Sequence, residues 1–230
     1  METTRQRLIS LKQNHPWKKG IPTRQILLTL GLGLFALLPL ALPAYAHHPT
    51  GGRLPANAFE GFLSGLGHPV IGFDHLLFVV AAGFAGSLLG RGVVIPMVFV
   101  LASLLGTGIH LLAFNLPVPE FMISASVLLF GMILAQGKQT HLLVIAGLGA
   151  IAGVFHGYAY GESIVGAEMS PLVAYLLGFT TIQLAISLVA WRVGRFWLKR
   201  SITQGLLNLR MVGCVIGGAG AALLSGVVLP

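Results

Sequence analysis

Metal-binding side chains concentrate in two short segments of this 230-residue chain. The first reads HPVIGFDH at residues 68–75, and the second reads FHGYAYGE at residues 155–162. Their histidines and carboxylates are His68, Asp74, His75, His156 and Glu162. Neutral imidazole combined with carboxylate suits divalent nickel, cobalt, zinc and iron, whereas Cu(I) prefers the sulfur ligands that are missing from these segments. The residue types therefore predict a site for a divalent transition metal.

The elements that carry these segments are apolar. The mean hydropathy is +0.87 and only 9% of residues are charged, which does not suit a water-soluble domain. Stretches of about 20 apolar residues are long enough to cross a bilayer as helices. We expect an all-α fold, a polytopic membrane helical bundle with six transmembrane helices after an N-terminal signal peptide. The expected spans are 69–90, 92–114, 118–136, 141–161, 170–191 and 209–229.

The N-terminal region has the pattern of a secretory signal peptide. Residues 1–25 are basic, residues 26–43 are apolar, and Ala44-Tyr45-Ala46 matches the small-x-small cleavage pattern. We predict a signal peptide over 1–46 and a six-span transporter domain over 47–230, although an uncleaved first span is the alternative. In both cases His47 emerges outside the cytoplasm, where it could help to capture a metal ion or could be only part of a polar terminus.

Charge placement predicts the orientation in the membrane. With His47 outside and six spans, the inner loops hold Arg91, Lys138 and the basic segment 192–210. The outer segments hold Glu60, Glu120, Glu162 and Glu168. Lysine and arginine are retained on the cytoplasmic side. We therefore expect a bacterial inner (plasma) membrane protein with both mature termini outside the cytoplasm. The basic residues show no interleaved aromatic patch of the kind that binds nucleic acid.

This orientation places the candidate ligands at one membrane face. His110 ends the second expected span and adds a further histidine there, while His141 falls on the opposite side. On an unbroken helix His68 and His75 would lie about 10.5 Å apart along the axis, at roughly 1.5 Å per residue. One ion needs bonds of about 2 Å to each ligand. We therefore expect a backbone break at Pro69 or Gly72, and by the same argument one between His156 and Glu162.

The two segments resemble the signature motifs of the HupE/UreJ family of nickel/cobalt permeases, HPxxGxDH and FHGxAxGxE. The leader, the histidine that follows it and the six spans are also similar. The resemblance implies a secondary permease that takes up nickel or cobalt without ATP and is not an enzyme. It further implies that His68, Asp74, His75, His156 and Glu162 are the functional residues, with Ni²⁺ or Co²⁺ as substrate and no resident cofactor.

Alternative readings stay open for each feature. The protein could be a metal-binding accessory for metalloenzyme maturation that does not transport, while an intramembrane metalloenzyme is disfavoured because there is no HExxH. Asp74 and His75 could be a structural pair, and His110 could be an interfacial residue. Tyr158 and Tyr160 are expected in the interfacial aromatic belt. The expected partners are the metal ion and the lipid bilayer, and a homo-oligomer is left open.

Overall fold

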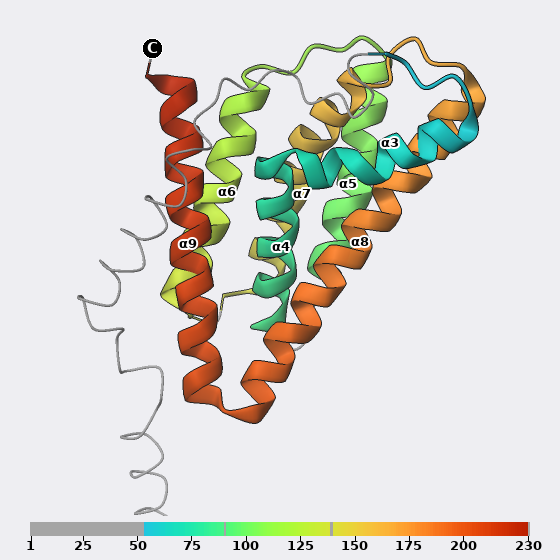
Figure 1. The fold of residues 1–230 in the computed structure, drawn as a ribbon. Helices are drawn as coiled ribbons and strands as arrows, with labels where there is room; N and C mark the ends of the chain where they lie inside the picture. The colour runs from blue at the N-terminus through green and yellow to red at the C-terminus, as the bar shows by residue number, and fades with distance from the viewer. Residues whose placement is uncertain (1–52, 90, 139, 230) are drawn as a thin grey trace, which may run out of the picture.

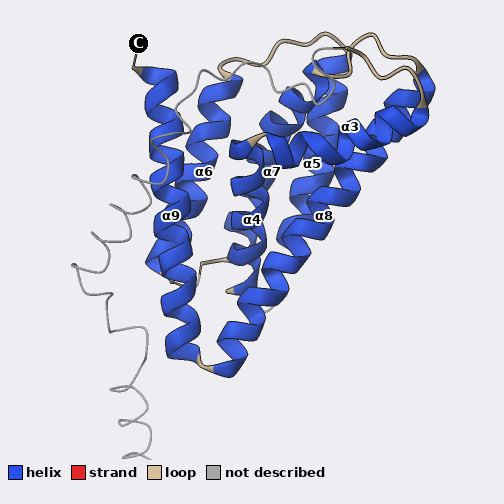
Figure 2. Ribbon diagram, in the orientation of Figure 1, coloured by secondary structure: helices blue, strands red, loops and turns tan. Residues whose placement is uncertain are grey.

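The computed structural model describes residues 53–89, 91–138 and 140–229, and within them every regular element is a helix (Figures 1 and 2). The expected all-α fold class is thus confirmed. The predicted signal peptide, its cleavage site and His47 lie outside the described residues. The helices are α3 (Ala58–Ile71), α4 (Phe73–Ser87), α5 (Val94–Leu111), α6 (Pro119–Gln136), α7 (Leu142–Glu162), α8 (Met169–Arg200) and α9 (Ile202–Val228).

Five of these helices, α5 to α9, are each long and apolar enough to cross a membrane. Helices α3 and α4 pass the same test together, but they meet at an angle of 79°. They make a sixth span only if the bent pair is taken as one. Figure 1 shows α3 lying across the bundle while α4 runs along it. The predicted first span, 69–90, contains all of α4 and the end of α3, while helical structure begins earlier, at Ala58.

The expected loop from residue 192 to 208 is largely helical. Helix α8 continues to Arg200, and α9 begins at Ile202 after a turn centred on Ser201. The basic side chains of this region are compatible with helix continuing beyond the apolar span, because arginine and lysine are good helix formers. Their long side chains can also reach water from a helix end. The Ser201 side chain then caps α9 by accepting a hydrogen bond from the Gln204 amide at 3.3 Å.

The predicted backbone break in the first segment is present at Gly72. This residue is extended, with φ −70° and ψ 101°, and it ends α3 and begins α4. Pro69 is accommodated inside α3. In the second segment the expected break is absent, because α7 is continuous from Leu142 to Glu162. Its glycines serve helix packing instead: a side chain on Gly157 would overlap the carbonyl oxygen of Ser103 on α5.

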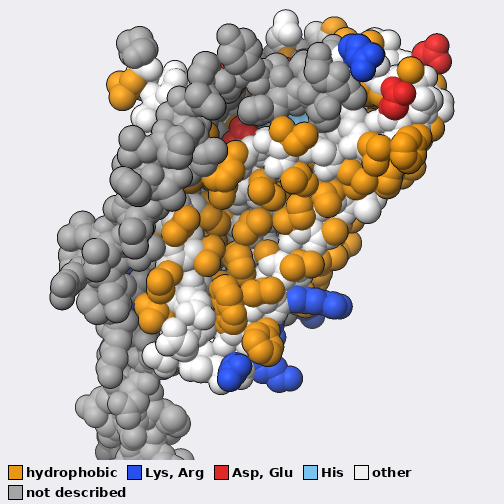
Figure 3. Space-filling view, viewed as in Figure 1, with side chains coloured by type: hydrophobic (Ala, Val, Ile, Leu, Met, Phe, Trp, Pro, Cys, Tyr) orange, Lys and Arg blue, Asp and Glu red, His pale blue; other side chains and the backbone are white. Residues whose placement is uncertain are grey.

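The two ends of the bundle differ in charge. Figure 3 shows apolar side chains over the middle of the molecule, lysine and arginine below, and aspartate and glutamate above, together with one basic group. We call these the basic end and the acidic end. The basic end holds Arg91, Lys138 and the arginines and lysine at the α8–α9 turn, while the acidic end holds Glu60, Glu120, Glu162, Glu168 and Arg53. An apolar waist between charged ends is typical of a membrane-embedded bundle.

Candidate metal site

Two buried histidines from different helices are in direct contact at the centre of the site. His75 lies in the first turn of α4 and is 5% exposed, and His156 lies in α7 and is fully buried. Their Nδ1 atoms are 2.7 Å apart, and their ring centroids are 4.9 Å apart. The lack of a side chain at Gly72 leaves room for the His75 ring, since a Cβ atom at position 72 would lie 2.6 Å from the His75 Cδ2 atom.

The hydrogen bonds around His156 assign the protons of this pair. Ser126 on α6 donates its only hydroxyl proton to the carbonyl oxygen of Ile123 at 2.7 Å. The Ser126 Oγ atom, 3.0 Å from His156 Nε2, must therefore accept a proton from that nitrogen. In a neutral His156 the Nδ1 atom is then the acceptor, so His75 Nδ1–H donates to it. The contact is a hydrogen bond donated by the His75 ring to the His156 ring.

His68 is the third histidine of the site. It lies in α3 and is 8% exposed, and its ring centroid is 5.6 Å from that of His75. Its Nδ1 atom lies 3.0 Å from both the Ser163 hydroxyl, just after α7, and the Tyr175 hydroxyl on α8. Those hydroxyl groups are within 2.8 Å of each other. This network fixes the ring of His68 and joins α3 to α7 and α8.

Tyr160 was expected at the membrane interface, but it lies in the middle of the histidines. Its side chain is fully buried, and its ring centroid is 4.5 Å from that of His75 and 5.0 Å from that of His68. Its hydroxyl group is buried and has no hydrogen-bond partner. Tyr158, 6% exposed, is also not interfacial. The sequence signal for Tyr160 is its position four residues after His156, on the same face of α7.

Asp74 stands at the start of α4, beside the histidine pair. Its Oδ1 atom accepts a hydrogen bond from the His75 backbone amide at 2.8 Å, and the side chain is half-buried. A carboxylate in the first turn also interacts favourably with the positive end of the helix dipole. Asp74 therefore stabilises the turn that presents His75 and brings a negative charge close to the site.

Glu162 and His110 do not join the three histidines. Glu162 is exposed at the end of α7. When FHGxAxGxE is aligned on Phe155 and His156, its glutamate falls on position 163, where this chain has serine. His110 instead packs against Tyr158, with ring centroids 4.3 Å apart, and its buried Nδ1 atom has no partner. His141, outside the predicted site, is exposed at the start of α7.

Three phenylalanines pack together next to the histidine pair. Phe78 on α4, Phe99 on α5 and Phe130 on α6 are fully buried. The Phe78 ring centroid is 4.8 Å from that of Phe99, 4.7 Å from that of Phe130 and 4.6 Å from that of His156. Phe78 follows His75 by one turn toward the basic end of α4. The phenylalanines therefore form an apolar layer between the histidines and that end.

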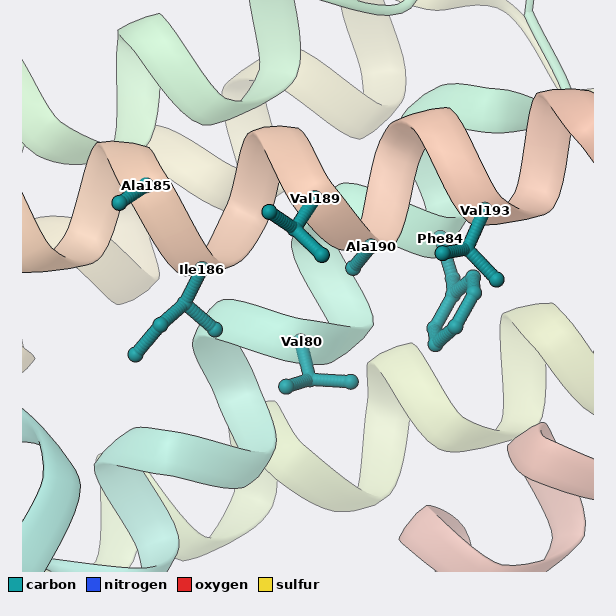
Figure 4. A pocket seen from close by; sticks show the side chains of 7 residues that line it. All are labelled: Val80, Phe84, Ala185, Ile186, Val189, Ala190 and Val193. Carbon is teal, nitrogen blue, oxygen red and sulfur yellow. The ribbon is translucent and has the colours of Figure 1, made fainter.

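A hollow of about 390 Å³ between α4 and α8 is a different kind of feature. Figure 4 shows the seven side chains that line it, and all are apolar. Val189, one of these residues, is 61% exposed and lies on the apolar surface of the bundle. Because it offers no ligand atom, this hollow is not a candidate for ion binding.

Among the described residues, no three histidine, cysteine, aspartate or glutamate side chains are placed to hold one ion together. The imidazoles instead pack edge to face, and they hydrogen-bond to one another or to hydroxyl groups. An ion could be bound between the Nδ1 atoms of His75 and His156 only if the hydrogen bond between them opened. The geometry is that of a compact polar cluster inside an apolar bundle.

Comparison with known proteins identifies the family. Residues 35–223 match the family model described as HupE / UreJ protein. The chain is also 34% identical over 197 residues to Protein HupE from Rhizobium leguminosarum bv. viciae, an alignment that covers 83% of this chain and 95% of that protein. The chain belongs to the HupE/UreJ family. No solved structure matches the chain significantly.

Membership of the HupE/UreJ family confirms the resemblance that the two segments indicated. It makes this chain a membrane protein related to nickel and cobalt, in agreement with its several apolar helices. His68, His75 and His156 all lie within the matched residues, and the structure brings them together.

Proposed function

We propose that the protein is a secondary permease that takes up Ni²⁺ or Co²⁺ and binds the ion in transit between His75 and His156. The observation that carries this proposal is the 2.7 Å separation of their Nδ1 atoms inside an apolar bundle. Ionisable groups are costly in the membrane interior and mark ion pathways there. Imidazole is a preferred ligand for nickel and related ions.

To accept an ion, the two rings must turn so that both Nδ1 atoms point at the metal, and they must move slightly apart. Two nitrogens at about 2.0–2.1 Å from one metal lie roughly 2.9–3.4 Å apart for bond angles between 90° and 109°. The Nδ1 atoms are 2.7 Å apart, so they must separate by a few tenths of an ångström. The proton on His75 Nδ1 must move to the other nitrogen of the ring, by exchange through water, since a metal-binding imidazole nitrogen carries no proton. The ion thus replaces a hydrogen bond.

The remaining groups supply charge and control access. Asp74 provides a negative charge beside the pair, and the Tyr160 hydroxyl is a further oxygen ligand that has no partner in this state. With the acidic end outside, a divalent ion moving to a negative interior gains about 4.6 kcal/mol per 100 mV, at roughly 2.3 kcal/mol per charge. Passage to the basic end requires the layer of Phe78, Phe99 and Phe130 to open, as in hydrophobic gates.

Flux into proteoliposomes tests this proposal. Vesicles containing the wild-type protein should accumulate radiolabelled nickel or cobalt when the interior is made negative, and the initial rate should fall at least tenfold in His156→Ala. His141→Ala, which changes an exposed histidine at the basic end of the bundle, is the matched control and should retain the wild-type rate. Metal binding by the wild-type protein without accumulation would contradict a permease and favour the accessory role.

A further inference from the structure

A glutamine in the middle of α8 is buried without full hydrogen bonding. Gln183 is 0% exposed, and its Nε2 atom has no partner. The Oε1 atom is 3.5 Å from the hydroxyl of Ser103 on α5. Ser103 has one hydroxyl proton, and it makes a shorter bond, 2.9 Å, to the carbonyl oxygen of Phe99. The amide of Gln183 is therefore weakly bonded at one end and unbonded at the other.

Either amide orientation leaves one end of this side chain unpartnered. Because the Ser103 proton is given to Phe99, the Ser103 oxygen is better suited to accept a proton than to donate one. Turning the amide would allow Nε2–H to donate to Ser103, and it would leave the Oε1 atom as an unpartnered carbonyl oxygen. A carbonyl oxygen in an apolar bundle is a ligand for a cation.

Gln183 lies between the histidine pair and the basic end. A side chain on Gly83 would overlap the carbonyl oxygen of Ser187, so these positions are at the same level of α4 and α8. Both helices run toward the basic end. Gly83 follows His75 by about 12 Å and Ser187 follows Gln183 by about 6 Å, at roughly 1.5 Å per residue. By this estimate the backbone of Gln183 is about 6 Å nearer the basic end than the backbone of His75.

Close contacts connect this position to the histidine site. Ser103 packs directly against Gly157, the residue next to His156. Thr107, one turn from Ser103, donates a hydrogen bond to the Gly157 carbonyl oxygen at 2.7 Å. On α8, Gln183 belongs to the buried face that also contains Tyr175, which contacts His68, and Ser187. Buried polar groups thus connect the histidine site with Gln183.

We propose that Gln183 is a second, transient station for the transported divalent cation, reached after the histidine pair. The inference rests on the proposed permease function. Neutral amide and hydroxyl oxygens bind nickel and cobalt more weakly than imidazole does. A weak second station suits transport, because conduction requires sites that an ion can leave as well as enter.

Three purified full-length proteins in proteoliposomes test the second station. Gln183→Leu removes the polar atoms at similar volume, and Gln183→Glu replaces the amide with a stronger cation ligand. Thr181→Val is the matched control, because Thr181 is exposed on the same helix and its hydroxyl bonds only to its own backbone turn, at the Leu177 carbonyl oxygen. Each protein is assayed for nickel uptake rate and for nickel affinity and stoichiometry by calorimetry.

We expect Gln183→Leu to bind nickel within about twofold of the wild-type affinity while its uptake rate falls at least tenfold. Gln183→Glu should bind a second equivalent of nickel, and Thr181→Val should match the wild type in both assays. Normal uptake by Gln183→Leu, a parallel loss of its binding, or a single equivalent in Gln183→Glu would overturn the second station. Wild-type protein that binds nickel but does not transport it would instead overturn the proposed function, and this inference with it.

Discussion

The two family segments place their histidines by different means. In the first, the chain breaks at Gly72, and α3 and α4 meet at 79°, so that His68 and His75 face one another from two helices. In the second, α7 is unbroken and lies so close to α5 that Gly157 contacts the Ser103 backbone. The histidines of the bent helix pair α3 and α4 thus meet the histidine of the unbroken helix α7.

The position of His75 is thus set by the direction of the backbone, whereas the position of His156 is set by helix packing. The break sets the direction in which His75 points, and a carboxylate at the new helix start holds that turn. Helix α7 has no break, so the position of His156 depends on the distance between α5 and α7. Changes at the break should therefore impair metal binding more than stability, and changes at the packed glycine should impair both.

Loss of the carboxylate at the break should have the largest effect. Asp74→Asn keeps the shape of the side chain but deletes its charge. At an effective dielectric constant of about 20, a divalent ion and a unit charge at 4 Å interact by roughly 8 kcal/mol before desolvation is subtracted. We expect initial nickel uptake at limiting concentration to fall more than tenfold, with expression and membrane insertion near normal. Normal uptake by this variant would show that transport does not require the charge of Asp74.

Gly157→Ala should disturb the contact between α5 and α7 that positions His156. The added methyl group would overlap the Ser103 carbonyl oxygen and push α5 and α7 apart, and overpacking of this kind costs about 1–3 kcal/mol. We expect a lower melting temperature in detergent together with reduced nickel affinity. Gly147→Ala, on the same helix with open space around the added atom, is the control and should melt no lower than the wild type. Equal melting of both variants would show that the close contact is unimportant.

Gly72→Ala should have a smaller effect, confined to binding. Alanine can adopt φ −70°, so the backbone need not change. Its methyl group would lie 2.6 Å from the His75 ring, which must then rotate. We expect nickel affinity in calorimetry to fall several-fold while the melting temperature changes little. A large loss of stability with unchanged affinity would reverse the roles assigned to the break and to the packed glycine.

Much of this arrangement could be predicted from the sequence. Apolar stretches predicted the helices, and the need to bring His68 near His75 predicted the break that occurs at Gly72. The same reasoning was wrong for α7, because it assumed that Glu162 had to reach the site. In the structure Glu162 is exposed. Spacing along one helix does not show whether Glu162 or the residue next to it points into the bundle.

The residues that surround the histidines could not be predicted from the sequence. Tyr160 and Tyr175 lie near the ends of apolar stretches, where tyrosine is commonly interfacial. They are buried because α3 crosses the bundle and packs on α8, as shown by the contact of Gly65 with the Tyr175 backbone. Ser126 and Gln183 come from helices without a recognisable motif. Their roles depend on which helix faces are adjacent, and this follows only from three-dimensional packing.

X-ray absorption spectroscopy of the nickel-loaded protein tests the central claim most directly. The account predicts at least two imidazole ligands at about 2.0–2.1 Å from nickel, with fewer imidazoles in both His75→Ala and His156→Ala. His141→Ala should give the wild-type spectrum. Nickel surrounded by oxygen ligands alone, or an imidazole count unchanged in both site variants, would contradict an ion held between His75 and His156.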